Sequence, residues 1–328
     1  MFGKMMNNFY YGKSGKGDFK KDDLPRNRWQ LFWEMLRIRL AGLFRLNLMT
    51  VVAFLPLMYV LISTANAILS QLVNLSNALS DPAAAEQAQQ LLQDNRNQLY
   101  GILFSSFVMM IPCILITGPV QAGMAYVTRN WARDEHAFVW SDFKDALKDN
   151  WKQALAVSAI TSVAPLLMLV CWQFYGGMAQ TNGMLFVIPQ MITLLLGLVW
   201  FLALTFMYPM MVTYKMNLGT VIRNSFMLAI GRLPHVLGVR LIMLSFTIIA
   251  GLFIFYTPYM MYAILLLSAY YFFIGNALAR FVYASFTNAV FDRYINTRIE
   301  GAQVNRGLAS ETDEDEEAEE EDNAGAGI

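Results

Sequence analysis

Long runs without Asp, Glu, Lys or Arg are the dominant pattern of the sequence. Four such runs cover residues 46–80, 97–128, 153–214 and 241–279. A helix crosses a hydrocarbon core of about 30 Å with roughly 20 apolar residues, because each backbone N–H and C=O must be paired there. The first two runs are therefore long enough for one span each. The last two are long enough for two, since FYGGMAQTNGM interrupts one and YTPY interrupts the other.

The pattern predicts an all-α, polytopic membrane protein with six transmembrane helices. We expect the spans at about residues 48–69, 98–117, 154–175, 185–212, 237–256 and 259–279. We place them in one membrane domain of residues 25–300. A disordered basic tail at 1–24 and a disordered acidic tail at 301–328 are expected to flank this domain.

In three segments that precede spans, apolar and polar residues are mixed, and the apolar ones recur at helical spacing. They are residues 28–47, 140–154 and 218–240, where apolar side chains recur at intervals of three and four. In the second segment this face consists of Trp140, Phe143, Leu147 and Trp151. We expect amphipathic helices at the membrane interface, where Trp is favoured. The alternative is that they only connect spans; their threefold occurrence also suggests an internal repeat of about 80 to 110 residues.

The basic residues indicate how the spans are oriented. Of the 24 Lys and Arg residues, 23 lie before the first span, in the second and fourth loops, or after the last span. Arg96 alone lies in a loop on the other side. Short loops rich in Lys and Arg stay in the cytoplasm. The distribution therefore predicts that both termini and the three amphipathic segments are cytoplasmic.

Composition agrees with a membrane protein and separates the two tails from its body. The chain is 56% hydrophobic and 15% charged, against about 25% charged in soluble proteins. Its formal net charge is zero only because ten of the twelve residues 311–322 are acidic. A segment so charged and so poor in apolar residues is expected to be disordered. The motif GKSGKG near the N-terminus lacks the earlier Gly of a phosphate-binding loop, so we interpret it as part of a disordered tail.

Neutral polar residues are the remaining candidates for a site within the membrane. We expect no charged side chain inside the spans, which argues against a proton-coupled carrier or an ion pump. The largest neutral groups are Asn47, Asn66, Gln190 and Asn276. They could bind a substrate hydroxyl, but bonds to neighbouring helices are the more common role.

Patterns typical of enzymes and metal sites do not occur in the sequence. His136 and His235 lie in different segments and belong to no catalytic motif. Cys113 and Cys171 stand in apolar runs without metal-ligand spacing. We therefore predict no enzymatic activity, no cofactor and no metal.

Residues 118–155, GPVQAGMAYVTRNWARDEHAFVWSDFKDALKDNWKQAL, resemble the signature of the YesL family of bacterial integral membrane proteins. The positions that carry the resemblance are Gly118, Pro119, Ala122, Arg129, Trp131 and Arg133. Two acids, Asp134 and Glu135, follow where the family has one. The resemblance implies a multi-pass protein of the bacterial plasma membrane, from a largely uncharacterised family whose genes accompany carbohydrate-uptake systems.

Three functions are compatible with these patterns. The leading one is an accessory or assembly component associated with carbohydrate uptake, whose partners are the lipid bilayer and a sugar importer or other membrane protein. The main alternative is a transporter or permease for a small neutral, sugar-like solute. A structural or signalling scaffold that uses the acidic tail is the third. We expect no binding of nucleic acid.

Overall fold

The computed structural model describes residues 24–80 and 87–309, and every regular element in these two stretches is helical. The main helices are α2 (Arg28–Leu79), α3 (Ala88–Trp131), α4 (Ser141–Asn182), α5 (Val187–Thr213), α6 (Leu218–Gly231), α7 (Leu233–Tyr256), α8 (Met260–Tyr270) and α9 (Asn276–Tyr294). Three short elements join them: η3 (Met184–Phe186), the π-helical η4 (Tyr271–Gly275) and η5 (Asn296–Arg298).

Six helical stretches of the described chain are long and apolar enough to cross a membrane. They run over Arg28–Leu79, Ala88–Trp131, Ser141–Asn182, Met184–Thr213, Leu233–Tyr256 and Met260–Arg298. This confirms the predicted all-helical class with six spans and supports a multi-pass membrane protein. The helices extend well beyond most of the predicted spans.

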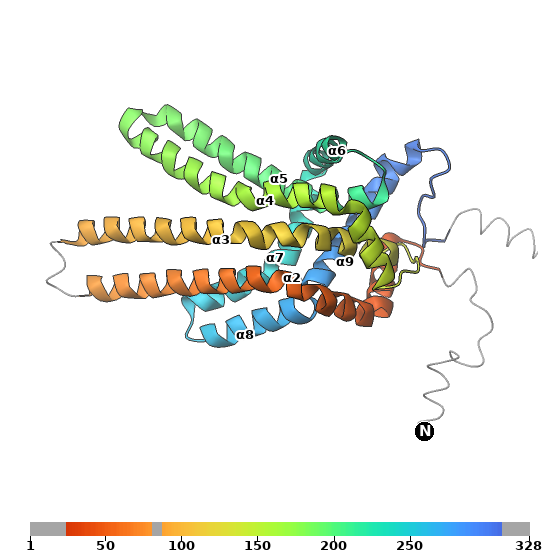
Figure 1. The fold of residues 1–328 in the computed structure, drawn as a ribbon, viewed down its shortest axis with the longest axis horizontal. Coiled ribbons are helices and arrows are strands. Elements are labelled where there is room, and N and C mark those ends of the chain that lie inside the picture. The colour runs from red at the N-terminus through yellow and green to blue at the C-terminus, as the bar shows by residue number, and fades with distance from the viewer. Residues whose placement is uncertain (1–23, 81–86, 310–328) are drawn as a thin grey trace, which may run out of the picture.

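The helices form an elongated bundle with two different ends (Figure 1). We call the end where α2 begins, α3 ends, α4 begins and α9 ends the basal end. At the distal end, α2 ends and α3 begins, and the α4–α5 and α7–α8 connections lie there too. The six spans therefore run alternately up and down, and both ends of the described chain lie at the basal end.

Two of the three predicted interfacial helices are continuous with the spans that follow them. α2 runs for 52 residues, or about 78 Å, from Arg28 to Leu79. α4 likewise includes both residues 141–154 and the third span. Only α6 is a separate helix, because Gly231 and Pro234 interrupt the hydrogen-bonding pattern before α7. Of the three segments, only residues 218–231 thus form a helix distinct from the span that follows, and their place at the membrane interface stays a prediction.

Buried side chains form two main clusters in the basal half of the bundle. One joins α3, α4, α5, α6 and α9 around Phe206 and Phe291. The other joins α2, α3 and α9 around Leu43, Trp131 and Phe281. The distal parts of the helices instead expose apolar side chains, as expected of surfaces that contact lipid.

The predicted tails are only partly covered by the described residues. Residues 1–23 and 310–328 lie outside them, so the expected disorder there stays a prediction. The acidic tail begins later than residue 301, because residues 301–309 pack against the body. The backbone N–H of Ala309 donates to the carbonyl of Pro25 at 3.2 Å, and Leu308 contacts the cluster around Trp131. This segment still carries apolar and hydrogen-bonding groups, whereas the run of acids starts only at Glu311.

A basal polar network as the candidate functional site

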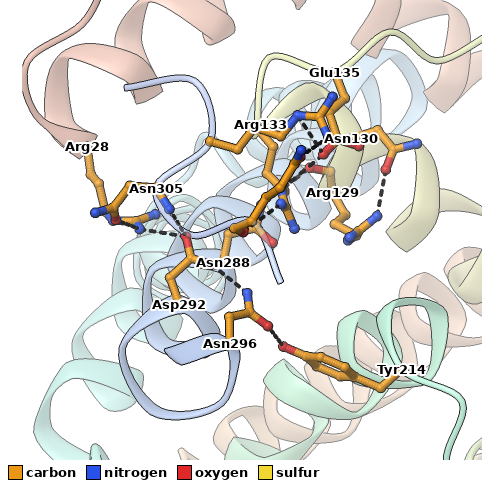
Figure 2. Close-up of polar contacts among 12 residues, drawn as sticks. Arg28, Arg129, Asn130, Arg133, Glu135, Tyr214, Asn288, Asp292, Asn296 and Asn305 are labelled. Carbon is orange, nitrogen blue, oxygen red and sulfur yellow. Dashed lines mark hydrogen bonds and ion pairs between the residues drawn. The ribbon is translucent and has the colours of Figure 1, made fainter. Parts of the chain in front are cut away.

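A network of polar side chains joins α2, α3, α9 and the C-terminal segment at the basal end (Figure 2). We call it the basal polar network; its labelled members are Arg28, Arg129, Asn130, Arg133, Glu135, Tyr214, Asn288, Asp292, Asn296 and Asn305. These residues come from four separate parts of the sequence: residue 28, residues 129–135, residue 214 and residues 288–305. The fold brings them together because α2, α3 and α9 all have one terminus there.

Asp292 is the centre of one half of the network. Its carboxylate is almost fully buried on α9 and accepts a hydrogen bond from Arg28 at 2.7 Å. It also accepts from the side chain of Asn296 at 2.5 Å and from the backbone N–H of Asn305 at 3.2 Å. A buried carboxylate is tolerated only when it is paired and hydrogen-bonded in this way. Asp292 therefore fixes the start of α2 and the C-terminal segment to α9.

Tyr214 extends this half of the network to the end of α5. Its hydroxyl donates to the Asn296 side chain at 2.6 Å, and its ring meets Phe291 edge-on at 5.6 Å. Burial, together with the nearby charge of Asp292, raises the pKa of Tyr214 to about 12. The hydroxyl is consequently protonated at neutral pH and acts as a donor.

Glu135 is the centre of the other half. Its carboxylate lies 3.1 Å from Arg133 and 3.4 Å from Arg306, so it joins the turn after α3 to the C-terminal segment. Arg133 also donates to the carbonyl of Gln303 at 3.3 Å. The neighbouring Asp134 has a left-handed backbone (φ 54°) and lies 3.8 Å from Arg39 of α2. Both acids of the Asp134–Glu135 pair thus have basic partners.

The motif residues that resemble the YesL signature divide into two groups. Gly118 and Ala122 are buried where α3 crosses α4, and a Cβ at Gly118 would lie 2.6 Å from the carbonyl oxygen of Ala154. Pro119 lies in the same part of α3. The second group, Arg129, Trp131 and Arg133, belongs to the basal end.

Within this second group, Arg129 and Trp131 fix the end of α3. Arg129 donates to Asn130 at 3.0 Å, and its carbonyl accepts from Asn288 of α9 at 3.3 Å. The buried Trp131 ring lies so close to α2 that a Cβ at Gly42 would be 2.9 Å from it. The residues of the motif therefore pack α3 against α2, α4 and α9.

The residues of the predicted interfacial face lie partly in the core and partly on the surface. Phe143 is buried against Gly123, and Leu147 packs partly into the cluster around Trp131. Trp140 and Trp151 are 63% and 45% exposed. Of the four residues of this face, these two tryptophans are the exposed ones that can contact lipid or a partner.

The four predicted intramembrane polar residues also differ in their roles. Buried Asn47 donates to the carbonyls of Tyr271 and Phe272 at 3.0 and 2.8 Å and accepts from Ala277 N–H at 2.9 Å. The π-helical turn η4 leaves such backbone groups without regular helical partners, and Asn47 satisfies them.

Two of the other three residues also bond to backbone. Gln190 donates to the carbonyl of Trp172 at 3.2 Å, and Asn276 donates to that of Tyr271 at 3.4 Å. Asn66 is exposed on α2. Three of the four candidates therefore hydrogen-bond to the backbone of the bundle.

Two arginines inside the bundle were missed as site residues. Arg240 of α7 donates to Thr205 at 2.8 Å and lies over the rings of Phe201 and Tyr283, 4.3 and 4.7 Å from their centroids. Arg280 of α9 lies 4.7 Å from the ring of Tyr208. The expectation of uncharged spans is thus wrong at Arg240, which lies within α7. The available signal for Arg240 was its position inside the span predicted at residues 237–256.

Three cavities are relevant to function. The first, of about 510 Å³, adjoins the basal polar network at Arg28, Asp292 and Asn305. The second, of about 700 Å³, lies between α3, α4 and α5 with almost entirely apolar walls. The third, of about 720 Å³, lies between the start of α4 and the segment after α5 and is lined by Asp142, Asp145 and Asp149. Residues 24–80 and 87–309 contain no cluster of three side chains suited to bind a metal.

Comparison with known proteins gives one match. A family model described as "Protein of unknown function, DUF624" matches residues 99–172, which include most of α3 and α4 and all of residues 118–155. This is consistent with a family of unknown function, whereas the YesL resemblance itself stays a prediction. The chain matches no curated protein and no solved structure.

Proposed function

We propose that the chain is a non-catalytic accessory or assembly component of a bacterial plasma-membrane system, with a carbohydrate importer as its partner. The observation that carries the proposal is a fixed basal end surrounded by exposed aromatic side chains. Trp29, Trp33, Phe138, Trp140 and Trp151 all expose much of their surface there. Aromatic side chains of this kind are favoured both at the membrane interface and in protein contacts.

The basal polar network supports this role because it holds the aromatic surface in one geometry. Its ion pairs connect α2, the turn after α3, the end of α9 and residues 301–309. A surface that is already ordered loses less conformational entropy when a partner binds. In the orientation that the basic residues favour, the basal end faces the cytoplasm. The importer as partner rests on the YesL resemblance.

Deletion of the gene in its native cells tests the proposal. We expect less assembled importer in the membrane and slower uptake of the sugar it carries, measured by native electrophoresis of a tagged importer and by radiolabelled sugar. Restoration by the wild-type chain is expected to recover both quantities. Unchanged importer assembly and uptake after deletion would contradict the proposal.

Substitution of exposed aromatics locates the contact. The double variant Trp140→Ser, Trp151→Ser should fold, because both side chains are largely exposed, yet fail to restore assembly. Its matched control is Phe174→Ser, Tyr256→Ser, which removes two exposed aromatics at the distal end. Equal loss in both variants would argue against a basal contact.

The alternative function, a permease for a small neutral solute, is favoured by the cavity of about 700 Å³ between α3, α4 and α5. Trp172 and Trp200 form part of its wall, and aromatic faces are suited to stack on sugar rings. The hydroxyl of Thr161, however, already accepts from Trp200 at 3.1 Å and donates to the Val157 carbonyl at 2.7 Å. Flux of labelled sugars into proteoliposomes that contain the purified chain would favour the permease, and its absence would favour the accessory role.

A further inference from the structure

The cavity of about 510 Å³ at the basal end, which we call the basal cleft, has an excess of positive charge. Its walls come from α9, from the start of α7, from Arg28 of α2 and from the segment at residues 304–305. The charged side chains that line it are those of Arg28, Arg232, Arg293 and Asp292. With His235 neutral, these groups carry a formal charge of +2 around one space.

The single carboxylate in the basal cleft does not neutralise Arg232 and Arg293. Asp292 is already engaged by Arg28, Asn296 and Asn305. Within residues 24–80 and 87–309, neither Arg232 nor Arg293 forms an ion pair. Both guanidinium groups lie near one ring, that of Tyr294, at 4.9 and 5.8 Å from its centroid. The two like charges therefore line one cavity, and neither is neutralised by a carboxylate of the described residues.

The Nε atom of Arg232 lacks a hydrogen-bond acceptor, as do the Nε atoms of Arg39, Arg129 and Arg133 elsewhere in the described residues. In Arg232 this nitrogen is buried and has no hydrogen-bond partner in the described part of the chain. A buried donor without an acceptor costs about 1–3 kcal/mol, so such groups are rare unless a ligand or water satisfies them. Because Arg232 lines the basal cleft, an acceptor bound there would lie within reach of its guanidinium.

The start of α7 also borders the basal cleft, directly after the C-terminal end of α6, whose dipole has the opposite sign there. Arg232 is the N-cap of this helix and His235 lies in its first turn, with Pro234 between them. The first backbone N–H groups of a helix have no partner within the helix, and the helix dipole makes this end positive. Arginine side chains and a helix N-terminus are two elements that phosphate-binding sites share.

We propose that the basal cleft binds the phosphate group of a phosphate ester, held by Arg232 and Arg293 at the start of α7. Guanidinium groups match phosphate oxygens with paired hydrogen bonds. The cleft is larger than one phosphate, and Phe286, Val290 and Val304 give it an apolar side for the carbon part of the ester. This proposal does not depend on the accessory role. The ester is either an anionic lipid headgroup or a soluble phosphorylated compound, because both present the same group.

Binding measurements on the purified full-length chain distinguish the two sources. In one arm, the chain is placed in nanodiscs of phosphatidylcholine with or without phosphatidylglycerol, and retained lipid is counted by native mass spectrometry. In the other arm, glycerol 3-phosphate is titrated into the chain in phosphatidylcholine nanodiscs and followed by calorimetry. Selective retention of phosphatidylglycerol identifies a lipid headgroup, whereas saturable binding of glycerol 3-phosphate identifies a soluble ester. Absence of both would overturn the proposal.

The decisive variant is Arg232→Gln, Arg293→Gln. Loss of a charge-assisted hydrogen bond should weaken binding about tenfold for each arginine, and about 100-fold for both. The matched control is Arg223→Gln, Arg298→Gln, which removes two exposed arginines that do not line the cleft. Wild-type affinity in the cleft variant, or equal loss in the control, would overturn the proposal in favour of general surface attraction.

A second variant remains informative should the double variant fail to fold. Val304→Glu places a carboxylate on the cleft wall while every arginine is kept, and Val304 is exposed enough to accept the change. We expect it to lose binding at least as strongly as the arginine variant, because the new carboxylate competes with the phosphate. Unchanged binding in Val304→Glu would place the phosphate elsewhere.

Discussion

Replacement of Asn47 by Leu tests the link between α2 and the π-helical turn η4. Asn47 is fully buried, and its side chain makes three hydrogen bonds of 2.8 to 3.0 Å to backbone groups of residues 271, 272 and 277. Leu has a similar volume but cannot donate or accept. The change therefore leaves two carbonyls and one N–H without their partner, with little change in packing.

The expected loss of stability follows from these three bonds. An unsatisfied buried polar group costs about 1–3 kcal/mol in a protein interior, whereas hydrogen bonds measured within membranes contribute about 0.6 kcal/mol on average. Loss of all three bonds should thus lower the free energy of unfolding by at least about 2 kcal/mol and at most about 9 kcal/mol. Because η4 can relax towards a regular helix and recover some bonds, we expect about 3 kcal/mol. This corresponds to a decrease in Tm of roughly 5 °C.

The assay is the fraction of monodisperse protein left after heating in detergent, measured by fluorescence-detected size exclusion. Asn66→Leu is the matched control, because Asn66 is exposed on the same helix and makes no hydrogen bond within the described residues. It should change stability by less than about 0.5 kcal/mol. Equal Tm values for Asn47→Leu and the wild type, or an equal decrease in both variants, would refute a role of Asn47 in fixing η4.

Three other predictions concern the α3–α4 crossing and the basal polar network. Gly118→Ala should destabilise the protein by about 1–3 kcal/mol through overpacking against α4, whereas Gly101→Ala, in open space, should be neutral or stabilising in the same thermal assay. Tyr214→Phe should cost about 1 kcal/mol for one lost hydrogen bond. Because the pKa of Tyr214 is about 12 when folded against 10 when unfolded, this stabilisation is complete below pH 10 and is lost towards pH 12. The Tm difference between wild type and Tyr214→Phe should therefore shrink over that interval. Glu135→Gln should accelerate tryptic cleavage after Arg306 several-fold, detected by mass spectrometry, because it removes the carboxylate that holds this segment; an unchanged cleavage rate would show that other contacts suffice.

The six spans could be predicted because they follow from a single physical constraint. Hydrocarbon excludes charges and unpaired backbone, so any charge-free run long enough to cross is recognisable without knowledge of tertiary contacts. The continuity of α2 could not be predicted in the same way. The predicted amphipathic segment ended at residue 47 and the first span began at residue 48, but a helix continues unless Gly, Pro or competing hydrogen bonds interrupt it. Gly231 and Pro234 are such residues, and the helix does end there.

Periodicity predicted a helical face at residues 140–151 but not what covers it. Phe143 became part of the core because α3 presents Gly123, which leaves room for the ring. Trp140 met no such space and stayed exposed. The apolar face of an isolated helix contains no information on the partner helix, so the division between core and surface had to come from the structure.

Local sequence patterns could not predict the basal polar network either. Arg133 and Gln303 are 170 positions apart, and Arg28 and Asp292 are 264 apart. Asp292 alone gave no signal, because a single acid near the end of a helix is common on protein surfaces. Its burial follows from three chain segments that meet at the basal end, which is a property of the topology.

Cations are stabilised differently at the basal end and inside the bundle. Arg240 and Arg280 lie over aromatic rings and have no carboxylate partner in the described ranges, whereas Arg306 and Arg39 depend on partly exposed ion pairs with Glu135 and Asp134. Salt screens exposed pairs much more than buried contacts with aromatic rings. Raised ionic strength should therefore release residues 301–309 before it affects the packing of α5, α7 and α9. We therefore expect the basal end, where the proposed phosphate site also lies, to be the part of the fold that responds to its ionic surroundings.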